Sequence, residues 1–80
     1  ILLGAMMDQM PECVFHNKRG TLLNPTIVSD MGILKCGEQT WYLMIAGTPA
    51  IDSTATFEDI QASIEEFAKV FGNYVQTYHP

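Results

Sequence analysis

The sequence predicts an α+β fold: a small antiparallel β-sheet of three to four strands, with a long C-terminal amphipathic helix and a short N-terminal helix packed on it. Two observations lead to this prediction. Apolar residues recur every three or four positions from residue 57 to residue 78, which is the spacing of one helix face. The chain before it consists of short apolar runs separated by turn residues, which is typical of strands. The length of 80 residues predicts a single small α+β domain over residues 1–80.

A short helix is expected over residues 1–9. Apolar residues recur there near helical spacing, and Pro11 stops the helix because the residue before a proline avoids helical dihedrals. The residues with this spacing are Leu2, Leu3, Met6, Met7 and Met10. Because the first residue is Ile1 and not methionine, we interpret the chain as a fragment or a processed subunit, and residues upstream of Ile1 are a further possibility.

A first hairpin is predicted after this helix. Residues 12–16 have the composition of a strand, and residues 17–20 have that of a turn, with Gly20 suited to a positive φ. Residues 21–23 would then return as the second arm. This arrangement predicts two short strands in this part of the chain.

Proline and glycine interrupt the strands of the next segment. Pro25 breaks the second arm, because proline cannot donate a hydrogen bond to the ladder. Residues 26–29 are rich in β-branched side chains and are expected to form a short strand. Residues 30–32, with the sequence Asp-Met-Gly, are predicted to form another turn.

The clearest hairpin joins residues 33–36 to residues 40–46 across a three-residue loop that contains Gly37. Side chains alternate between the two faces of a strand, and here both sets are apolar. One set is Trp41, Leu43 and Ile45, and the other is Tyr42, Met44 and Ala46. A strand that is apolar on both faces is usually covered on both sides. We therefore expect the C-terminal helix on one face and the N-terminal segment or a second subunit on the other.

The C-terminal helix has a recognisable beginning. Thr56 is a good N-cap, and Asp59 three residues later completes a short variant of the capping box. Gly72 is unusual inside a helix, and we interpret it as a place where the helix approaches the sheet closely or where its well-ordered part ends. We expect Phe67 and Phe71 to pack in the core together with the tryptophan of the preceding hairpin.

The charge excludes some classes of partner. The net charge is −5, and the four basic residues form no stripe that could neutralise a phosphate backbone, so nucleic-acid binding is not expected. No apolar run reaches the length of a membrane span. The apolar content of 48% is high for so short a chain. Since small monomers seldom expose large apolar patches, this content favours a protein partner or a homo-oligomer.

Two cysteines leave two alternatives open. A disulfide between Cys13 and Cys36 would stabilise the fold by roughly 3 kcal/mol through loop entropy and would favour a secreted protein. Otherwise both are buried thiols in a cytoplasmic protein. A cysteine nucleophile is the weakest hypothesis, because the alternation of side chains puts Cys13 and His16 on opposite faces of a strand. A pairing of Cys36 with His16 across strands remains geometrically possible. The spacing of histidines, cysteines and carboxylates predicts no metal site and no cofactor.

The expected function is that of a non-enzymatic protein-interaction module, which buries an apolar face against a partner or a second copy of itself. Methionine and tyrosine are common at such surfaces. The candidate interface residues are Met6, Met7, Met10, Tyr42, Met44, Tyr74 and Tyr78. The alternative is a small secreted toxin or effector subunit that is released by proteolysis and held by the disulfide.

The second half of the chain also resembles a known class of protein. Its strand, loop and acidic amphipathic helix are similar to the closing elements of small secretion chaperones, which are acidic α+β dimers that mask apolar segments of a client. The resemblance includes no diagnostic motif and does not extend to the N-terminal half. It implies masking of a partner and assigns a role to no individual residue.

Overall fold

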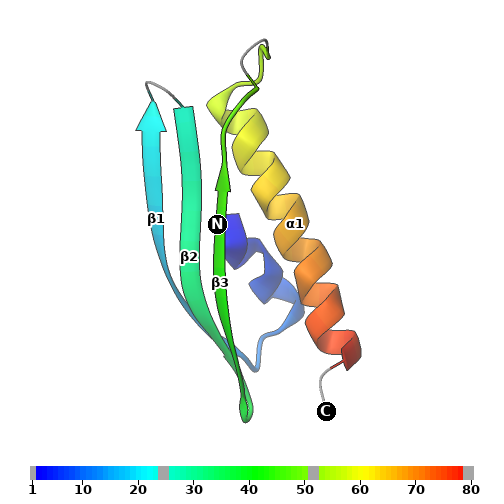
Figure 1. Cartoon of the computed structure of the whole chain (residues 1–80). Helices are drawn as coiled ribbons and strands as arrows, with labels where there is room; N and C mark the ends of the chain where they lie inside the picture. Colours follow the sequence, from blue (N-terminus) through cyan, green and yellow to red (C-terminus); the bar gives the residue numbers. More distant parts are fainter. Residues whose placement is uncertain (1, 24–25, 51–52, 79–80) are drawn as a thin grey trace.

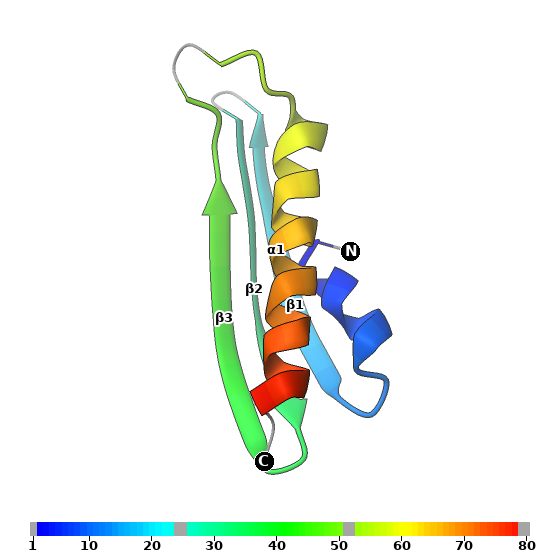
Figure 2. The same ribbon diagram turned by 90° about the vertical axis from the view of Figure 1, so that its right-hand side faces the viewer.

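A computed structural model gives the fold of residues 2–23, 26–50 and 53–78. The elements in chain order are η1 (Leu2–Gln9), β1 (Val14–Leu23), β2 (Thr26–Cys36), β3 (Gln39–Gly47) and α1 (Phe57–Tyr78). The strands form one antiparallel sheet with β2 in the middle (Figure 1). Figure 2 shows the sheet as one layer, with η1 and α1 together in a second layer on one of its faces. The predicted α+β fold is confirmed, with three strands.

The long helix α1 begins and ends where the apolar spacing predicted. Its first turn is closed by the predicted capping box. The Asp59 N–H donates to Thr56 Oγ1 at 3.2 Å, and the Thr56 N–H donates to Asp59 Oδ2 at 2.9 Å. These two bonds satisfy N–H groups that have no partner inside the helix.

The buried line of α1 differs from the expected stripe. Buried residues recur at Ile60, Ile64, Ala68, Gly72 and Val75, while the Phe67 side chain is 45% exposed. The prediction that Phe67 is a core residue is therefore wrong. The small side chains at positions 68 and 72 allow η1 to lie against α1, since a Cβ built on Gly72 would be 3.2 Å from the Met6 Cβ. The close approach at Gly72 is thus to η1 and not to the sheet.

The N-terminal helix η1 is a 3-10 helix and not an α-helix. It is held at its beginning by two carboxylates from different elements. The Leu3 N–H donates to Asp30 Oδ2 at 3.1 Å, and the Leu2 N–H donates to Glu65 Oε2 at 3.2 Å. These long-range bonds replace the backbone partners that a helix beginning lacks. They fix η1 between β2 and α1.

Strands β1 and β2 are each longer than expected. The predicted turns at 17–20 and 30–32 are wrong, because both segments lie inside a continuous ladder that pairs Asn17 with Gly32 and Arg19 with Asp30. On an edge strand polar side chains can reach solvent, so Lys18 and Arg19 do not require a turn. The predicted break at 24–25 lies outside the described residues.

The hairpin between β2 and β3 is confirmed, with a shorter loop. Cys36 pairs with Gln39, so the connection has two residues and not three. Gly37 has a φ of 63°, and glycine at the first central position is typical of the type II′ turn that suits a two-residue hairpin.

The core lies between the sheet and the helical layer. Its largest fully buried apolar side chains are Leu3, Met6, Met10, Val28, Leu34 and Val75. At one end of the core, a disulfide joins Cys13, just before β1, to Cys36 at the end of β2. The sequence left open whether these cysteines are bridged, and the structure contains the bridge.

Candidate protein-binding surface

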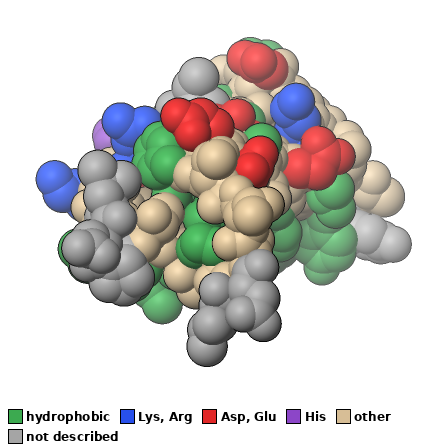
Figure 3. Space-filling view, turned by 90° about the horizontal axis from the view of Figure 1, so that it is seen from above, with side chains coloured by type: hydrophobic (Ala, Val, Ile, Leu, Met, Phe, Trp, Pro, Cys, Tyr) green, Lys and Arg blue, Asp and Glu red, His purple; other side chains and the backbone are tan. Residues whose placement is uncertain are grey.

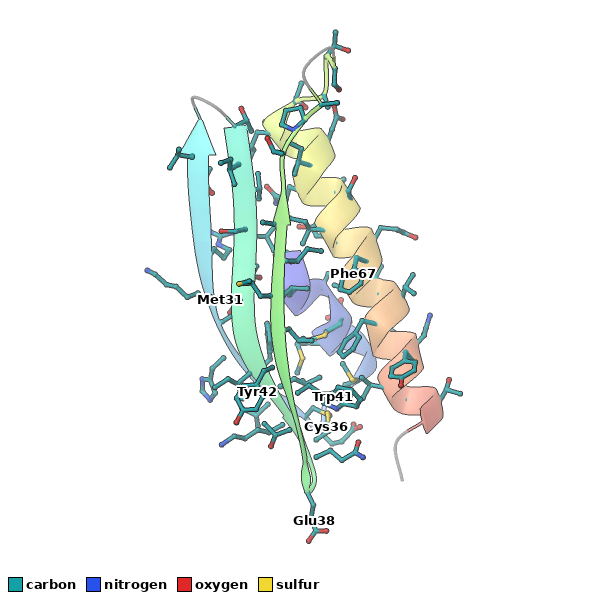
Figure 4. The ribbon with its side chains drawn as sticks, in the orientation of Figure 1. Met31, Cys36, Glu38, Trp41, Tyr42 and Phe67 are labelled. Carbon is teal, nitrogen blue, oxygen red and sulfur yellow. A yellow bond between two sulfur atoms is a disulfide. The ribbon has the colours of Figure 1, made fainter. Side chains whose placement is uncertain are left out.

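The two faces of the sheet have different surroundings. The expectation that the N-terminal segment covers the face opposite α1 is wrong, because η1 lies on the same side as α1 (Figure 2). In Figure 4, Trp41 lies on the helical side of β3 and Tyr42 on the other side. No element of the described chain packs on that second side. We call it the open face.

The open face carries most of the exposed large apolar side chains of the sheet. The cross-strand register aligns Ile33 with Tyr42 and Met31 with Met44, so these four side chains lie together on β2 and β3. Tyr42 and Met44 are 79% and 77% exposed. The exposed large apolar residues of this face are Val14, Leu22, Ile27, Met31, Ile33, Tyr42 and Met44. Met31, Ile33, Tyr42 and Met44 form one apolar cluster in the middle of this face, and Ser29 lies between this cluster and Ile27.

A shallow hollow of about 530 Å³ lies in the middle of the open face. Its lining includes Met31, Ile33, Tyr42 and Met44, and Lys18 lies at its β1 side. Methionine and tyrosine give such a surface flexible side chains and large contact area. The hollow has the composition expected of a site for apolar side chains of another molecule.

The charges of the two layers are of opposite sign. Within the described residues the open face carries Lys18, Lys35 and His16, and it carries no acidic residue. Four acidic residues lie on α1: Glu58, Asp59, Glu65 and Glu66. Figure 3, seen from above, shows Asp and Glu side chains gathered over α1 with one basic side chain among them, and the other basic side chains on the β1 side. The open face is therefore apolar with a cationic border.

Only some of the residues predicted to form an interface lie on the open face. Met6 and Met10 are buried in the chain's own core, which removes them from the accessible surface, and Met7 is half-buried. Tyr42 and Met44 lie on the open face. Tyr74 is 48% exposed on α1, away from that face, and the Tyr78 side chain lies outside the described part.

Sequence reasoning did not find the β2 half of the open face. Met31 was assigned to a turn, and Ile33 was given no surface role. The alternation along β3 identified Tyr42 and Met44, and extending the same alternation through β2 would have paired them with Met31 and Ile33. The signal was present, but the predicted turn at 30–32 interrupted it.

The two cysteines considered for catalysis lie apart from this surface, whereas His16 is part of it. Cys13 and Cys36 are both oxidised in the disulfide, so neither carries a free thiol. No group of three or more metal-ligating side chains occurs among the described residues. Within the same residues no helix is long and apolar enough to span a membrane.

Comparison of the chain with protein-family models, with curated proteins and with solved structures finds no match. The resemblance to secretion chaperones stays a prediction.

Proposed function

We propose that this protein is a non-enzymatic interaction module that binds a protein partner through the open face. The observation that supports the proposal best is the pair Tyr42 and Met44, which are 79% and 77% exposed beside Met31 on the uncovered side of the sheet. Isolated apolar residues are common on protein surfaces, but a continuous apolar surface with a polar border is typical of a contact site.

Burial of the exposed apolar side chains of the open face would favour binding of a partner. Burying a large apolar side chain that is otherwise exposed stabilises a complex by about 1.5–3 kcal/mol. Because Met31, Ile33, Tyr42 and Met44 are between 38% and 79% exposed, burying what remains exposed of them would contribute roughly 4–7 kcal/mol before the costs of association. Tyrosine is also enriched among residues that dominate binding energy.

The charges favour a partner with acidic residues around its apolar surface. Lys18 and Lys35 lie on β1 and β2, and both point to the open face. A second copy stacked face to face would bring two sets of lysines together without an acidic residue between them, which is unfavourable. A foreign partner with acidic flanks would instead pair with them.

Dye binding to the open face tests this proposal. We expect anilinonaphthalene sulfonate to fluoresce with the wild-type protein, and the fluorescence to fall in a Tyr42→Lys, Met44→Lys double variant. The control is Ala62→Lys on the exposed side of α1, which should leave the signal unchanged. Circular dichroism would establish that each variant is folded. Absent fluorescence with the wild type, or an equal signal from the double variant, would contradict the proposal.

The disulfide favours a second candidate, a small secreted effector subunit. Such bonds persist mainly in oxidising compartments. The bridge between Cys13 and Cys36 supports this alternative without assigning a target. Alkylation of the protein in extracts of its source, before any reduction, would test it. Two alkylated thiols would exclude the secreted form, and none would be expected if it is correct.

A further inference from the structure

The outer edge of β3 is a long strand edge without charge. In the described chain β3 pairs only with β2, and none of its nine residues is charged. The opposite edge of the sheet, on β1, carries the exposed Lys18 and Arg19. Charged side chains on an edge strand discourage pairing with other chains. The edge of β1 is protected in this way, and the edge of β3 is not.

The register indicates which backbone groups this edge offers. In an antiparallel ladder, hydrogen-bonded and non-hydrogen-bonded pairs alternate. A two-residue hairpin makes its closing pair, Cys36 with Gln39, a hydrogen-bonded one. Counting from there, Tyr42 and Met44 belong to non-hydrogen-bonded pairs and direct their N–H and C=O groups to the outer edge. The backbone there is arranged to accept another strand.

Aromatic side chains of α1 lie beside the same edge. We call Phe67, Phe71 and Tyr74 the aromatic row. Their rings stack at centroid distances of 6.3 Å and 6.1 Å, and Trp41 of β3 meets Phe71 edge-on at 5.5 Å. Phe67 and Tyr74 are 45% and 48% exposed. In Figure 1, α1 lies to the right of β3, beyond the outer edge of the sheet, and Figure 4 shows Phe67 on the side of α1 toward β3.

We propose that the edge of β3 and the aromatic row form a second binding site, which takes an extended uncharged segment of a partner chain as a fourth strand. Its backbone would pair with β3, and every second side chain would cover Phe67 and Tyr74. A strand lies about 4.8 Å from its neighbour, which places an added strand over the part of α1 that extends past β3. One occupant thus satisfies the free backbone groups and buries the exposed rings.

The chemistry of the segment follows from the site. Both sides of the site, β3 and the aromatic row, are free of charge, so a charged side chain placed there would lose water without gaining a partner. Apolar or β-branched residues at alternate positions would suit it. A second copy is a poorer occupant. Antiparallel pairing of β3 with β3 of a second copy would put both α1 helices on the same face of the joined sheet. Each α1 already lies beyond the edge of its own β3, so the two helices would collide.

Titration with a short capped peptide of alternating valine and threonine, followed by amide NMR, tests the proposal. We expect shift changes at the outer edge of β3 and in the aromatic row. Met44→Pro removes an outward N–H, and it should weaken peptide binding by about tenfold or more. Met44→Ala removes the side chain but keeps the N–H, and should retain most of the affinity. Tyr74→Lys should weaken binding, while Asn73→Lys, with the same added charge, should not.

Three results would overturn this proposal. They are shift changes confined to the open face, equal losses of affinity for Met44→Pro and Met44→Ala, and a concentration-dependent dimer in sedimentation with the β3 amides protected. The variant Met31→Lys separates the two sites, because it alters the open face alone. It should lower dye fluorescence and leave peptide binding unchanged. The dye assay and the peptide titration therefore test the open face and the edge of β3 independently of one another.

Discussion

The Asp30 carboxylate accepts a hydrogen bond from the backbone N–H of Leu3 at 3.1 Å, and this bond connects the middle strand to the N-terminal helix. Asp30 is 1% exposed, and the Asn17 side chain also donates to both of its oxygens, at 3.0 Å and 3.1 Å. A buried carboxylate is tolerated only when it is hydrogen-bonded. This relationship holds η1 on the helical side of the sheet and leaves the other side open.

Replacing Asp30 by alanine is expected to destabilise the protein by about 2–3 kcal/mol, because the Leu3 N–H and the Asn17 amide lose their acceptor. Urea unfolding measures the loss. Amide exchange at Leu3 should also accelerate. As a control, Glu66→Ala on the exposed side of α1 should change stability by less than about 0.5 kcal/mol. If Asp30→Ala also lowered the free energy of unfolding by less than about 0.5 kcal/mol, the anchoring role of Asp30 would be contradicted.

Adding a methyl group at Gly32 is expected to cost about 1–3 kcal/mol. A Cβ there would be 2.5 Å from the backbone oxygen of His16 and 2.6 Å from the Phe15 ring. Gly4→Ala is the matched control, since nothing lies within 4 Å of a Cβ at that position. Thermal unfolding of the two variants compares them. If Gly4→Ala proved as harmful as Gly32→Ala, the packing of Phe15 over Gly32 would not be the cause.

Removal of the Thr56 hydroxyl should lower the free energy of unfolding by about 1 kcal/mol, because the Asp59 N–H loses its cap. The exposed Thr54 offers a control, and Thr54→Ala should be close to neutral. The effects of Thr56→Ala and Asp59→Ala should not add, since the two side chains form one reciprocal unit. Additive losses would indicate that the two contacts act independently.

Reducing the disulfide should lower stability by about 3 kcal/mol in the loop-entropy model, since Cys13 and Cys36 are 23 positions apart in the sequence. Urea unfolding with and without reductant gives the difference. A Cys13→Ser, Cys36→Ser double variant should be insensitive to reductant and should match the reduced protein. Unchanged stability on reduction of the wild type would indicate that the bridge is not formed.

The sequence was sufficient for the elements whose signals are local. The spacing of apolar residues along α1, the capping box at Thr56 and the alternation around Trp41 each depend on near neighbours. The class of fold followed from these. The faces of β3 were also separated correctly, and Tyr42 and Met44 of the candidate surface were identified in that way.

The errors occurred where distant contacts decide the structure. Asp30 and Gly32 resemble a turn locally, but Asp30 is held by Asn17 and Leu3, and Gly32 is needed where the Phe15 ring crosses the strand. Which face η1 covers depends on the same buried carboxylate. None of these partners is near in sequence, so turn propensity alone gave the wrong result.

The exposure of the methionine methyl groups tests the central claim most directly. A soluble nitroxide broadens NMR signals of methyl groups that it can approach, and the measurement would use a concentration at which sedimentation shows a monomer. We predict strong broadening of Met31 and Met44, which are 50% and 77% exposed, and little of Met6 and Met10, which are buried. If Met31 and Met44 in the monomer were as protected as Met6 and Met10, the chain would cover its own sheet and the proposed binding surface would not exist.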